Sequence, residues 1–358
     1  MRALSHRTDV SNTTQTGQGH LDKTITDWLA ESHTDAFVVV HRGELVAEWY
    51  AAPEVETTPQ ALMSITRSFV GCLAGVLEKM GALDLDAPVG RYLPEVMFGG
   101  YSGAMVRDLL DMRTGGSYHE EHDNPESELG LISRALLPTE QQPPTLHGLV
   151  SRSLRPAMTG GPFSYRSLDT EVLGWVLERA ASRAMPQLLE DELLGPLGLE
   201  FPGSMNVDTA SNAHHAGGLS LTARDLSRFG LLLLQGGAVD DKQLVPIEFL
   251  RDIRSGGEDS REAFLAGLEP ELPLTPMAVS SIYRNHFWVP EQGRRQLLCI
   301  GIHGQLLYVD PDNDTVVVKL SSWPTPRNPK LFTLGFNCAV AAAQALGGYP
   351  QKLPMLIA

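Results

Sequence analysis

The last third of this 358-residue chain carries four runs of strand-forming residues with only short turns between them. In order along the chain, the runs read YRNHFWVP, RQLLCIGI, QLLYVDP and TVVVKLSSW. Turn-forming residues such as Pro311-Asp312-Asn313 separate them. Parallel neighbours need a crossover connection of a dozen or more residues, and none of the separating segments is long enough for a crossover helix. The sequence therefore predicts an antiparallel meander in this part of the chain.

Helix and hairpin patterns near the N-terminus predict the partners of this meander. Apolar residues at helical spacing over 21–32 indicate a helix, and AFVVVHRG and ELVAEWYA indicate two strands joined by Arg42-Gly43. A second helix is predicted over 64–80, with Gly81 placed to end it. Apolar positions over 331–346 indicate a closing helix. Strands from both ends of the chain can then share one sheet.

The middle of the chain predicts a different organisation, because it combines loop-rich stretches with helices expected at 168–185 and 187–195. A long amphipathic helix then starts at Ser220 or Thr222 and stops at Gly236-Gly237. We expect an α/β fold of the α+β kind, an antiparallel sheet flanked by helices plus an all-helical subdomain, with a ligand cleft between the two. The predicted division is a flexible segment 1–20, a split α/β domain of 21–83 and 216–358, and a mostly helical subdomain of 84–215.

Charge and hydropathy exclude several classes of partner. The formal net charge is -15, whereas nucleic acids and anionic membranes are bound by clustered Lys and Arg. The longest apolar run, FVGCLAGVL, is far shorter than the roughly 20 residues that cross a bilayer. The first twenty residues contain no apolar segment typical of a secretory signal, so we expect a cytoplasmic location. The sequence carries no signal for the oligomeric state.

Cysteines and nucleotide motifs exclude further kinds of site. Cys72, Cys299 and Cys338 are too few and too scattered for a disulfide framework or a zinc cage, and we expect buried thiols in a reducing compartment. The chain lacks a G-x-S-x-G elbow, which excludes the α/β-hydrolase type. No glycine-rich phosphate-binding motif follows a strand. We therefore expect no cofactor.

The first candidate catalytic feature is Ser64-Ile65-Thr66-Arg67, at the start of the predicted helix 64–80. It differs from the S-x-x-K signature of penicillin-recognising serine enzymes only in its last residue. The free N–H groups of a helix start favour the negative charge that develops in acyl transfer, and Arg67 projects from the same face as Ser64. Taken alone, such a pair is more often an N-cap serine beside a surface charge.

Tyr165 is the second candidate. It lies just before a predicted helix with an apolar stripe over 168–180 and with Ser167 or Asp169 as its cap. Tyr165-Arg166-Ser167 matches a Y-x-S/N pattern in which a tyrosine beside a cation shuttles protons. A neighbouring positive charge lowers the pKa of a phenol, as such a base requires. Taken alone, a tyrosine in this place usually packs in the core.

The third candidate is the segment Gly301-Ile302-His303-Gly304-Gln305, which we expect on a strand that lines the cleft. Glycine in a strand allows a ligand to approach the backbone. The N–H of Gln305 can then join the N–H of Ser64 as an oxyanion hole. The alternative is a glycine bulge with a half-buried His303 that has no role in binding.

Together and in this order, the three features resemble the serine β-lactamase, penicillin-binding protein and esterase superfamily. The chain is most similar in pattern to 6-aminohexanoate-dimer hydrolases and class C β-lactamase-like esterases. The resemblance runs from about residue 36 to 345 and is carried by SITRSF, VRDLLDMRTGGSY, HEEHDNPES, FSYRSLDTEVLGWVLE, GGLSLTARDLSRFGLLLLQGG, GIHGQLLYVDP and TVVVKLSSWP. It implies a β-lactamase/transpeptidase-like fold.

The resemblance also implies roles for particular residues. Ser64 would be the acyl nucleophile, and Tyr165 the general base and the acid for the leaving group. Gly304-Gln305 would pair with the substrate. His122, in the loop HEEHD where relatives tend to carry a tyrosine, would face the substrate.

The chain departs from the pattern at two positions. The lysine of S-x-x-K is Arg67, and a guanidinium does not accept the serine proton as a desolvated amine can. The cation of the K-T-G pattern maps to Ile302, with His303 beside it. The missing cation argues against a substrate whose carboxylate is clamped there, as in penicillins.

We therefore expect a serine hydrolase or transacylase that cleaves a small-molecule amide or ester through an acyl-serine intermediate. The alternative is a catalytically impaired, natural or engineered, β-lactamase-like protein that binds ligands without turnover. A metal site in the loop HEEHD is disfavoured, because its spacing is not H-E-x-x-H and the segment is not helical. No metal is expected.

Overall fold

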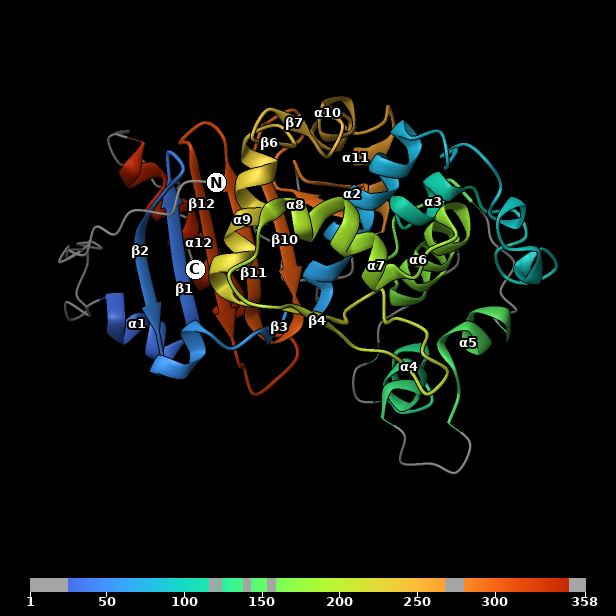
Figure 1. Cartoon of the computed structure of the whole chain (residues 1–358), viewed down its shortest axis with the longest axis horizontal. Coiled ribbons are helices and arrows are strands. Elements are labelled where there is room, and N and C mark those ends of the chain that lie inside the picture. Colours follow the sequence, from blue (N-terminus) through green and yellow to red (C-terminus); the bar gives the residue numbers. More distant parts are fainter. Residues whose placement is uncertain are drawn as a thin grey trace.

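The structure, a computed structural model, describes residues 25–115, 121, 124–137, 143–152, 159–267 and 280–347. Within these residues the main sheet has seven antiparallel strands in the order β2-β1-β12-β11-β10-β9-β8 (Figure 1). The predicted meander and the sheet shared by both ends of the chain are confirmed. The predicted flexible segment 1–20 lies outside the described residues. The strands are β1 Thr34–His41, β2 Glu44–Tyr50, β8 Ile282–Arg284, β9 Phe287–Val289, β10 Leu297–Gly301, β11 Gln305–Asp310 and β12 Thr315–Ser321.

Two tight turns set the strand boundaries. Arg42 and Gly43 have φ angles of 53° and 76° and link β1 to β2, as in a hairpin whose two central residues are left-handed. Asn285 and His286, with φ angles of 50° and 66°, make a similar turn inside the run YRNHFWVP. The sequence predicts one strand there, and that prediction is wrong. Because asparagine tolerates the left-handed region, the run folds into the hairpin β8–β9 instead.

Helices cover both faces of the sheet and build the middle of the chain. In Figure 1, α3 to α7 lie on the right, away from strands β1, β2 and β12. The helices are α1 Ile25–Glu31, α2 Thr66–Lys79, α3 Val106–Leu110, α4 Glu128–Leu136, α5 Leu146–Arg152, α6 Ser167–Ala181, α7 Met185–Leu189, α8 Gly195–Leu197, α9 Ala223–Leu234, α10 Ile247–Ser255, α11 Ser260–Ala266 and α12 Pro329–Leu346. Short strands β3 Gln60–Ala61, β4 Ser204–Met205 and β5 Leu219–Leu221 form a small sheet, and β6 Ala238–Val239 pairs with β7 Lys242–Gln243.

The ends of several helices follow the expected capping chemistry. Thr222 caps α9, since its hydroxyl accepts a hydrogen bond from Asp225 N at 3.1 Å, so the second of the two predicted caps is correct. Gly236 and Gly237, both with positive φ, follow the end of that helix. The predicted helix at 187–195 consists of α7, a π-helical turn and α8 in succession.

Alternation along β12 decides what packs on each face of the sheet. Val316 and Val318 belong to the apolar cluster under α9 and α2, whereas Val317 belongs to the cluster under α12. Gly230 of α9 lies so close to β12 that a Cβ there would be 2.4 Å from Val316 Cγ1. In Figure 1, α9 runs across the strands in yellow. The sheet therefore has a buried apolar layer on both faces.

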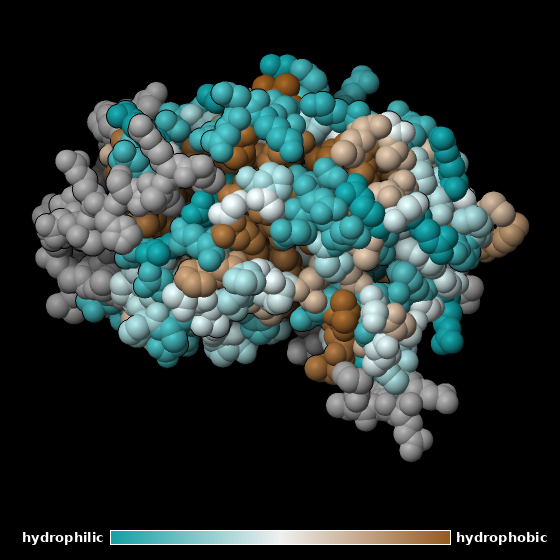
Figure 2. All heavy atoms as spheres, viewed as in Figure 1, coloured by the Kyte–Doolittle hydropathy of each residue, from teal (hydrophilic) through white to brown (hydrophobic). Residues whose placement is uncertain are grey.

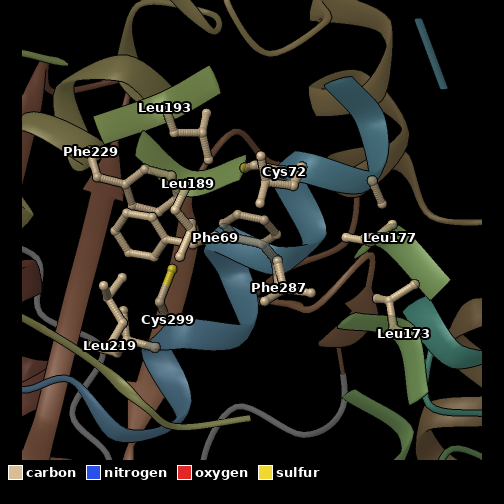
Figure 3. Packing of buried hydrophobic residues seen from close by; sticks show 14 of the residues in the cluster. Phe69, Cys72, Leu173, Leu177, Leu189, Leu193, Leu219, Phe229, Phe287 and Cys299 are labelled. Atoms are coloured by element: carbon tan, nitrogen blue, oxygen red, sulfur yellow. The ribbon is translucent and has the colours of Figure 1, made fainter. Parts of the chain in front are cut away.

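The core joins α2 to the sheet and to the helices in the middle of the chain (Figure 3). Phe69 of α2 stacks on Phe229 of α9 with ring centroids 3.8 Å apart. Cys72 and Cys299 lie buried in the same cluster as free thiols, as expected from the sequence. Cys338 is also a free thiol but is only partly buried.

Hydrophilic residues cover much of the face drawn in Figure 2, with apolar side chains visible between them near its centre. In the part of the chain that the structure describes, none of the helices combines the length and the apolar character required to cross a membrane.

Candidate active site

Ser64 lies in a short 3-10 turn, Met63–Ile65, that leads directly into α2. Met63 has a φ of 49°, and a non-glycine residue in this left-handed region costs about 1 kcal/mol or more. Such strain is concentrated at functional sites. Ser64 is half-buried, and its Oγ makes no hydrogen bond to any of the described residues. The hydroxyl is therefore available to a ligand.

The turn that carries Ser64 packs against the end of β10. A Cβ at Gly301 would lie 2.6 Å from the carbonyl oxygen of Leu62 and 3.0 Å from Met63 Cβ. The 3-10 turn Met63–Ile65 also contacts β10 directly. On its other edge, β10 pairs with β9 at Leu298, three residues before Gly301. Because glycine allows this close approach, the end of β10 is held directly beside the Ser64 turn.

Arg67 projects from the first turn of α2 and lies under Tyr165. Its side chain is buried, and its guanidinium carbon is 4.2 Å from the centroid of the Tyr165 ring. Nη2 donates to Ser167 Oγ at 2.6 Å, and Nε donates to the carbonyl of Ala216 at 3.2 Å. A guanidinium fixed so close to the ring makes a cation–π contact with the tyrosine.

Aromatic side chains fix the ring of Tyr165 on its other sides. The ring centroid lies 5.2 Å from that of Trp288 and 5.9 Å from that of Tyr283, with the second pair nearly perpendicular at 89°. Phe163 lies 6.4 Å away. Edge and tilted contacts of this kind are favourable for aromatic pairs. The ring is therefore held in one orientation beside Arg67.

The predicted caps of the helix after Tyr165 are wrong. Ser167 is the first residue of α6 and accepts the hydrogen bond from Arg67 described above, and the residue at the cap position, Arg166, makes no capping hydrogen bond with its side chain. Asp169 accepts hydrogen bonds from the hydroxyls of Tyr101 at 2.9 Å and Thr114 at 2.7 Å. Both side chains are thus used in tertiary contacts rather than at the helix end.

The segment from Gly301 to Gln305 is a hairpin turn and not the strand expected from the sequence. Gly301 ends β10, Gln305 begins β11, and His303, with a φ of 61°, lies in the 3-10 turn between them. Gln305 is buried, and its amide donates to Ser321 O at 2.7 Å and accepts from Ser321 N at 3.1 Å. The turn follows because Gly304, with a φ of 89°, packs its backbone against Trp323.

One pocket brings together several of the predicted residues. Ser64, Tyr165, Gly304 and Gln305 all line it, with Arg67 directly behind Tyr165. The remaining described lining residues come from β9 to β12 and from the start of α12, and they are mostly apolar. They are Trp288, Ile300, Gly301, Ile302, Leu306, Lys319, Trp323, Pro326, Arg327, Asn328, Leu331, Phe332 and Gly335.

Two predicted ligand contacts are not among the described residues that line this pocket. His303 lines a neighbouring hollow with Met63 and Asp35, and its Nδ1 lies 2.7 Å from the carbonyl of Trp323. His122 lies outside the described residues, as does most of the loop HEEHD. Among the residues that are described, no group of His, Cys, Asp and Glu side chains is arranged to hold a metal ion.

A buried ionic network, which was not predicted from the sequence, holds the loop that binds Arg67. Glu171 of α6 accepts hydrogen bonds from Ala216 N at 2.9 Å and His215 N at 3.2 Å. Its carboxylate also lies 2.7 Å from His214 Nδ1 and 3.1 Å from His215 Nδ1. The loop held in this way includes Ala216, whose carbonyl accepts the hydrogen bond from Arg67 Nε. The signal was present, because Glu171 follows Ser167 by four residues and so shares its helix face.

This network is expected to make stability depend on pH. Burial lowers the pKa of His215, but the hydrogen bond to Glu171 and the carboxylate of Glu178, 3.6 Å from Nε2, outweigh burial and raise that pKa from 6.5 to about 9. Burial raises the pKa of Glu171, yet the charge of His214 and the hydrogen bonds from both histidines bring it far below its usual value. The imidazolium of His215 therefore stabilises the fold fully below pH 6.5, and this contribution is lost as the pH rises through about 9.

The measurement is the free energy of unfolding between pH 6 and pH 9.5 for the native chain and for His215→Gln, compared at each pH so that other titrations cancel. The difference should shrink with rising pH by an amount on the order of 3 kcal/mol at most. A difference that stays constant over this range would show that His215 is neutral in the folded protein.

Comparison of the sequence with known proteins identifies the family of this chain. The β-lactamase family model matches residues 21–335. A 6-aminohexanoate-dimer hydrolase from Paenarthrobacter ureafaciens is 33% identical over 301 residues, which are 83% of this chain and 75% of that protein.

Solved structures show the same fold. A proposed 6-aminohexanoate-dimer hydrolase from Bacillus anthracis matches with a TM-score of 0.79 and 27% identity, over 92% of this chain and 84% of that one. EstCE1, a hydrolase with promiscuous acyltransferase activity, matches with a TM-score of 0.67 and 19% identity, over 88% and 96% of the two chains. The fold class expected from the sequence is confirmed.

Proposed function

Because the chain belongs to the β-lactamase family of serine hydrolases, we propose that it cleaves an amide or ester through an acyl-enzyme on Ser64. The observation that carries this proposal is the shared pocket of Ser64 and Tyr165, with the guanidinium of Arg67 4.2 Å from the tyrosine ring. A nucleophile, a proton acceptor and a fixed cation are the groups that acyl transfer to serine requires. They come from three elements that the fold brings to one place.

The proposed reaction has two halves. In the first, Ser64 Oγ attacks the carbonyl carbon while its proton passes to the Tyr165 phenolate, and the phenol then protonates the leaving amine or alcohol as its bond to carbon breaks. In the second, water attacks the ester of Ser64 and gives a proton to Tyr165, and the phenol returns that proton to Ser64 Oγ as the acyl–oxygen bond breaks. The released acid and the free serine hydroxyl restore the starting state.

The tetrahedral intermediate needs donors for its oxyanion. The N–H of Ser64 and an N–H of the hairpin 301–305 are the proposed donors, with Gln305 the residue expected from the sequence. The close packing of Gly301 on Leu62 supports this assignment, since it fixes the two backbone segments beside one another. Preorganised backbone donors of this kind contribute strongly to catalysis.

Arg67 is proposed to act by charge and not by proton transfer. Its guanidinium stays protonated at any working pH, so it lowers the pKa of the tyrosine without competing for the serine proton. The competing proposal is a β-lactamase-like protein that binds ligands but has lost turnover because its lysine is replaced. The two proposals differ in what a lysine at position 67 would do.

Exchanging Arg67 for lysine separates these two proposals. If Tyr165 is the base, Arg67→Lys keeps the cation and should change kcat/KM for a p-nitrophenyl ester by less than about tenfold. Arg67→Met, which removes the charge, should lower kcat/KM by about 10²-fold, because the phenolate loses its partner. The measurement is steady-state hydrolysis of the ester by the three chains at matched pH.

A gain of more than about 10²-fold in Arg67→Lys would support the impaired protein, since a lysine base alone supplies that much. Equal rates in all three chains, and in Ser64→Ala, would overturn the serine mechanism itself.

The substrate and the acyl acceptor belong to the same proposal. The relative named 6-aminohexanoate-dimer hydrolase supports a small-molecule amide as the substrate here. Either water or an amine can take the acyl group from Ser64, so a transacylase remains within the proposed mechanism.

A further inference from the structure

The pocket extends from Ser64 along the face of the sheet that α12 covers. Ile300 of β10 pairs with Leu306 of β11, and Leu306 pairs with Lys319 of β12. These three residues therefore form one row across three adjacent strands, and all three line the pocket. Phe332 and Gly335 of α12 line it from the opposite side. The pocket is thus a slot between the sheet and the first turns of α12.

Lys319 is a buried lysine within this slot, with 3% of its surface exposed. Its stem packs on α12, where a Cβ at Gly335 would lie 3.4 Å from Lys319 Cδ. Its ammonium donates to Ser321 Oγ at 2.5 Å and lies 5.6 Å from the centroid of the Trp323 ring. Among the described residues, no carboxylate forms an ion pair with this ammonium. An ammonium has three N–H donors, so it can donate further hydrogen bonds to a ligand.

The charges around the slot favour an anion. Lys319 and Arg327 line it, and none of its described lining residues is Asp or Glu, although the chain as a whole carries a net charge of -15. Burial lowers the pKa of Lys319 to about 8, and the electrostatic interactions with Cys338 and Asp35 act in the opposite direction. At neutral pH the side chain is therefore mainly a desolvated cation, for which a carboxylate is a strong partner.

We propose that Lys319 binds a carboxylate carried by the substrate, so that the enzyme selects amides or esters with an anionic end separated from the scissile carbonyl by an apolar spacer. This proposal rests on the proposed function of Ser64. The apolar residues of the slot, Ile300 and Leu306 among them, contact the spacer, and the ammonium contacts its end. The cation that K-T-G enzymes carry next to the nucleophile is absent at Ile302, and Lys319 supplies one further along the sheet.

The sheet geometry sets the length of the spacer. Neighbouring strands lie about 4.8 Å apart, so the backbone of Lys319 is on the order of 10 Å from that of Ile300. Ile300 precedes Gly301, which packs beside the Ser64 turn. The spacer must therefore cross about two strand spacings, roughly 10 Å, between carbonyl and carboxylate. Shorter acids would leave the ammonium without its partner.

Stability distinguishes this role from a structural one. A buried ammonium without an anionic partner is costly, whereas a methionine of similar shape fills an apolar slot without that cost. Lys319→Met should therefore melt at the same temperature as the native chain or higher. If Lys319 were retained for folding, Lys319→Met would melt at a lower temperature than the native chain.

The test compares p-nitrophenyl monoesters of succinic, adipic, suberic and sebacic acid with the matching esters that end in a carboxamide. A second pair, an N-acyl aminoalkanoate and its carboxamide, places the anion in the leaving group. In the native chain, kcat/KM in at least one series should favour the carboxylate by about tenfold or more at the best length. Lys319→Met should abolish this preference, because it lowers kcat/KM for the carboxylates far more than for the carboxamides.

Two controls accompany the kinetics. Lys330→Met removes an exposed lysine in the first turn of α12 and should keep the preference. Lys319→Arg should keep part of it, since the charge remains. An unchanged carboxylate preference in Lys319→Met, or none in either series of the native chain, would overturn the proposal.

Binding measurements separate this proposal from the serine mechanism. Calorimetry with suberate monomethyl ester and its carboxamide needs no turnover. Preferential binding of the carboxylate to the native chain and to Ser64→Ala, lost in Lys319→Met, would support the anion site even if no ester were hydrolysed. Equal binding of both probes to the native chain would overturn the anion site even if Ser64 were acylated.

Discussion

Ser64→Ala is expected to lower kcat/KM for p-nitrophenyl esters by about 10⁴-fold or more, because no acyl-enzyme can form without the hydroxyl. The fold should not change. Ser64 is half-buried and its Oγ bonds to none of the described residues, so the free energy of unfolding should change by less than about 0.5 kcal/mol. Steady-state kinetics and denaturant unfolding of both chains measure the two quantities.

Ser68, one turn further along α2, provides the matched control. It is buried and its hydroxyl donates to the carbonyl of His286 at 2.9 Å. Ser68→Ala should cost about 1 kcal/mol of stability, as expected for a lost buried hydrogen bond, and should retain hydrolysis. Native turnover in Ser64→Ala would contradict the mechanism.

Tyr165→Phe carries the second-largest expected effect, a loss of about 10²–10⁴ in kcat with little change in KM. Phenylalanine keeps the ring between Arg67 and Trp288, so the substitution removes the phenolic oxygen and little else. The alkaline and acid limbs of the pH profile should change as well, because the group that accepts the serine proton is gone. Steady-state kinetics over a range of pH measure both effects.

Tyr283→Phe is the control for this substitution within the same aromatic cluster. Its hydroxyl lies 3.2 Å from His286 Nδ1, and Tyr283 is not among the described lining residues of the pocket. We expect it to retain kcat within about threefold. Similar losses in both variants would indicate that the cluster, and not the phenol of Tyr165, supports the reaction.

Most of the sheet could be predicted from local sequence patterns, because turn-forming residues separate most of its strands. Arg42-Gly43 and Pro311-Asp312-Asn313 are recognisable turns, and short connections leave antiparallel pairing as the outcome. The hairpin β8–β9 was missed because its turn, Asn285-His286, contains no glycine or proline. The division into a split α/β domain and a helical subdomain at 84–215 stays a prediction.

From residue spacing, only the part of the site whose residues are close together in the sequence could be predicted. Arg67 follows Ser64 by three residues on one helix, so the pair could be found in the sequence. The contact between Arg67 and Tyr165 joins positions about a hundred residues apart, and only the family pattern linked them. No local sequence pattern shows that Glu171 and Ala216 hold Arg67, because the hydrogen bonds that link these residues join segments far apart in the sequence.

The burial of Lys319 is a second feature that could not be predicted from the local sequence. It is the lone charged residue in the apolar strand β12, a pattern that usually marks a solvent-facing position. Its burial follows from α12, which covers that face of the sheet, and from Gly335, which leaves room for the lysine stem. A single charge in such a strand is therefore a useful signal once a covering helix is predicted.

Mass spectrometry of the quenched protein tests the central claim most directly. The native chain, mixed with a p-nitrophenyl ester and stopped with acid within the first turnovers, should gain the mass of one acyl group, located by proteolysis on the peptide that contains Ser64. Ser64→Ala treated in the same way should gain none. An acyl group on any other residue of the native chain, or on Ser64→Ala to the same extent, would contradict the account.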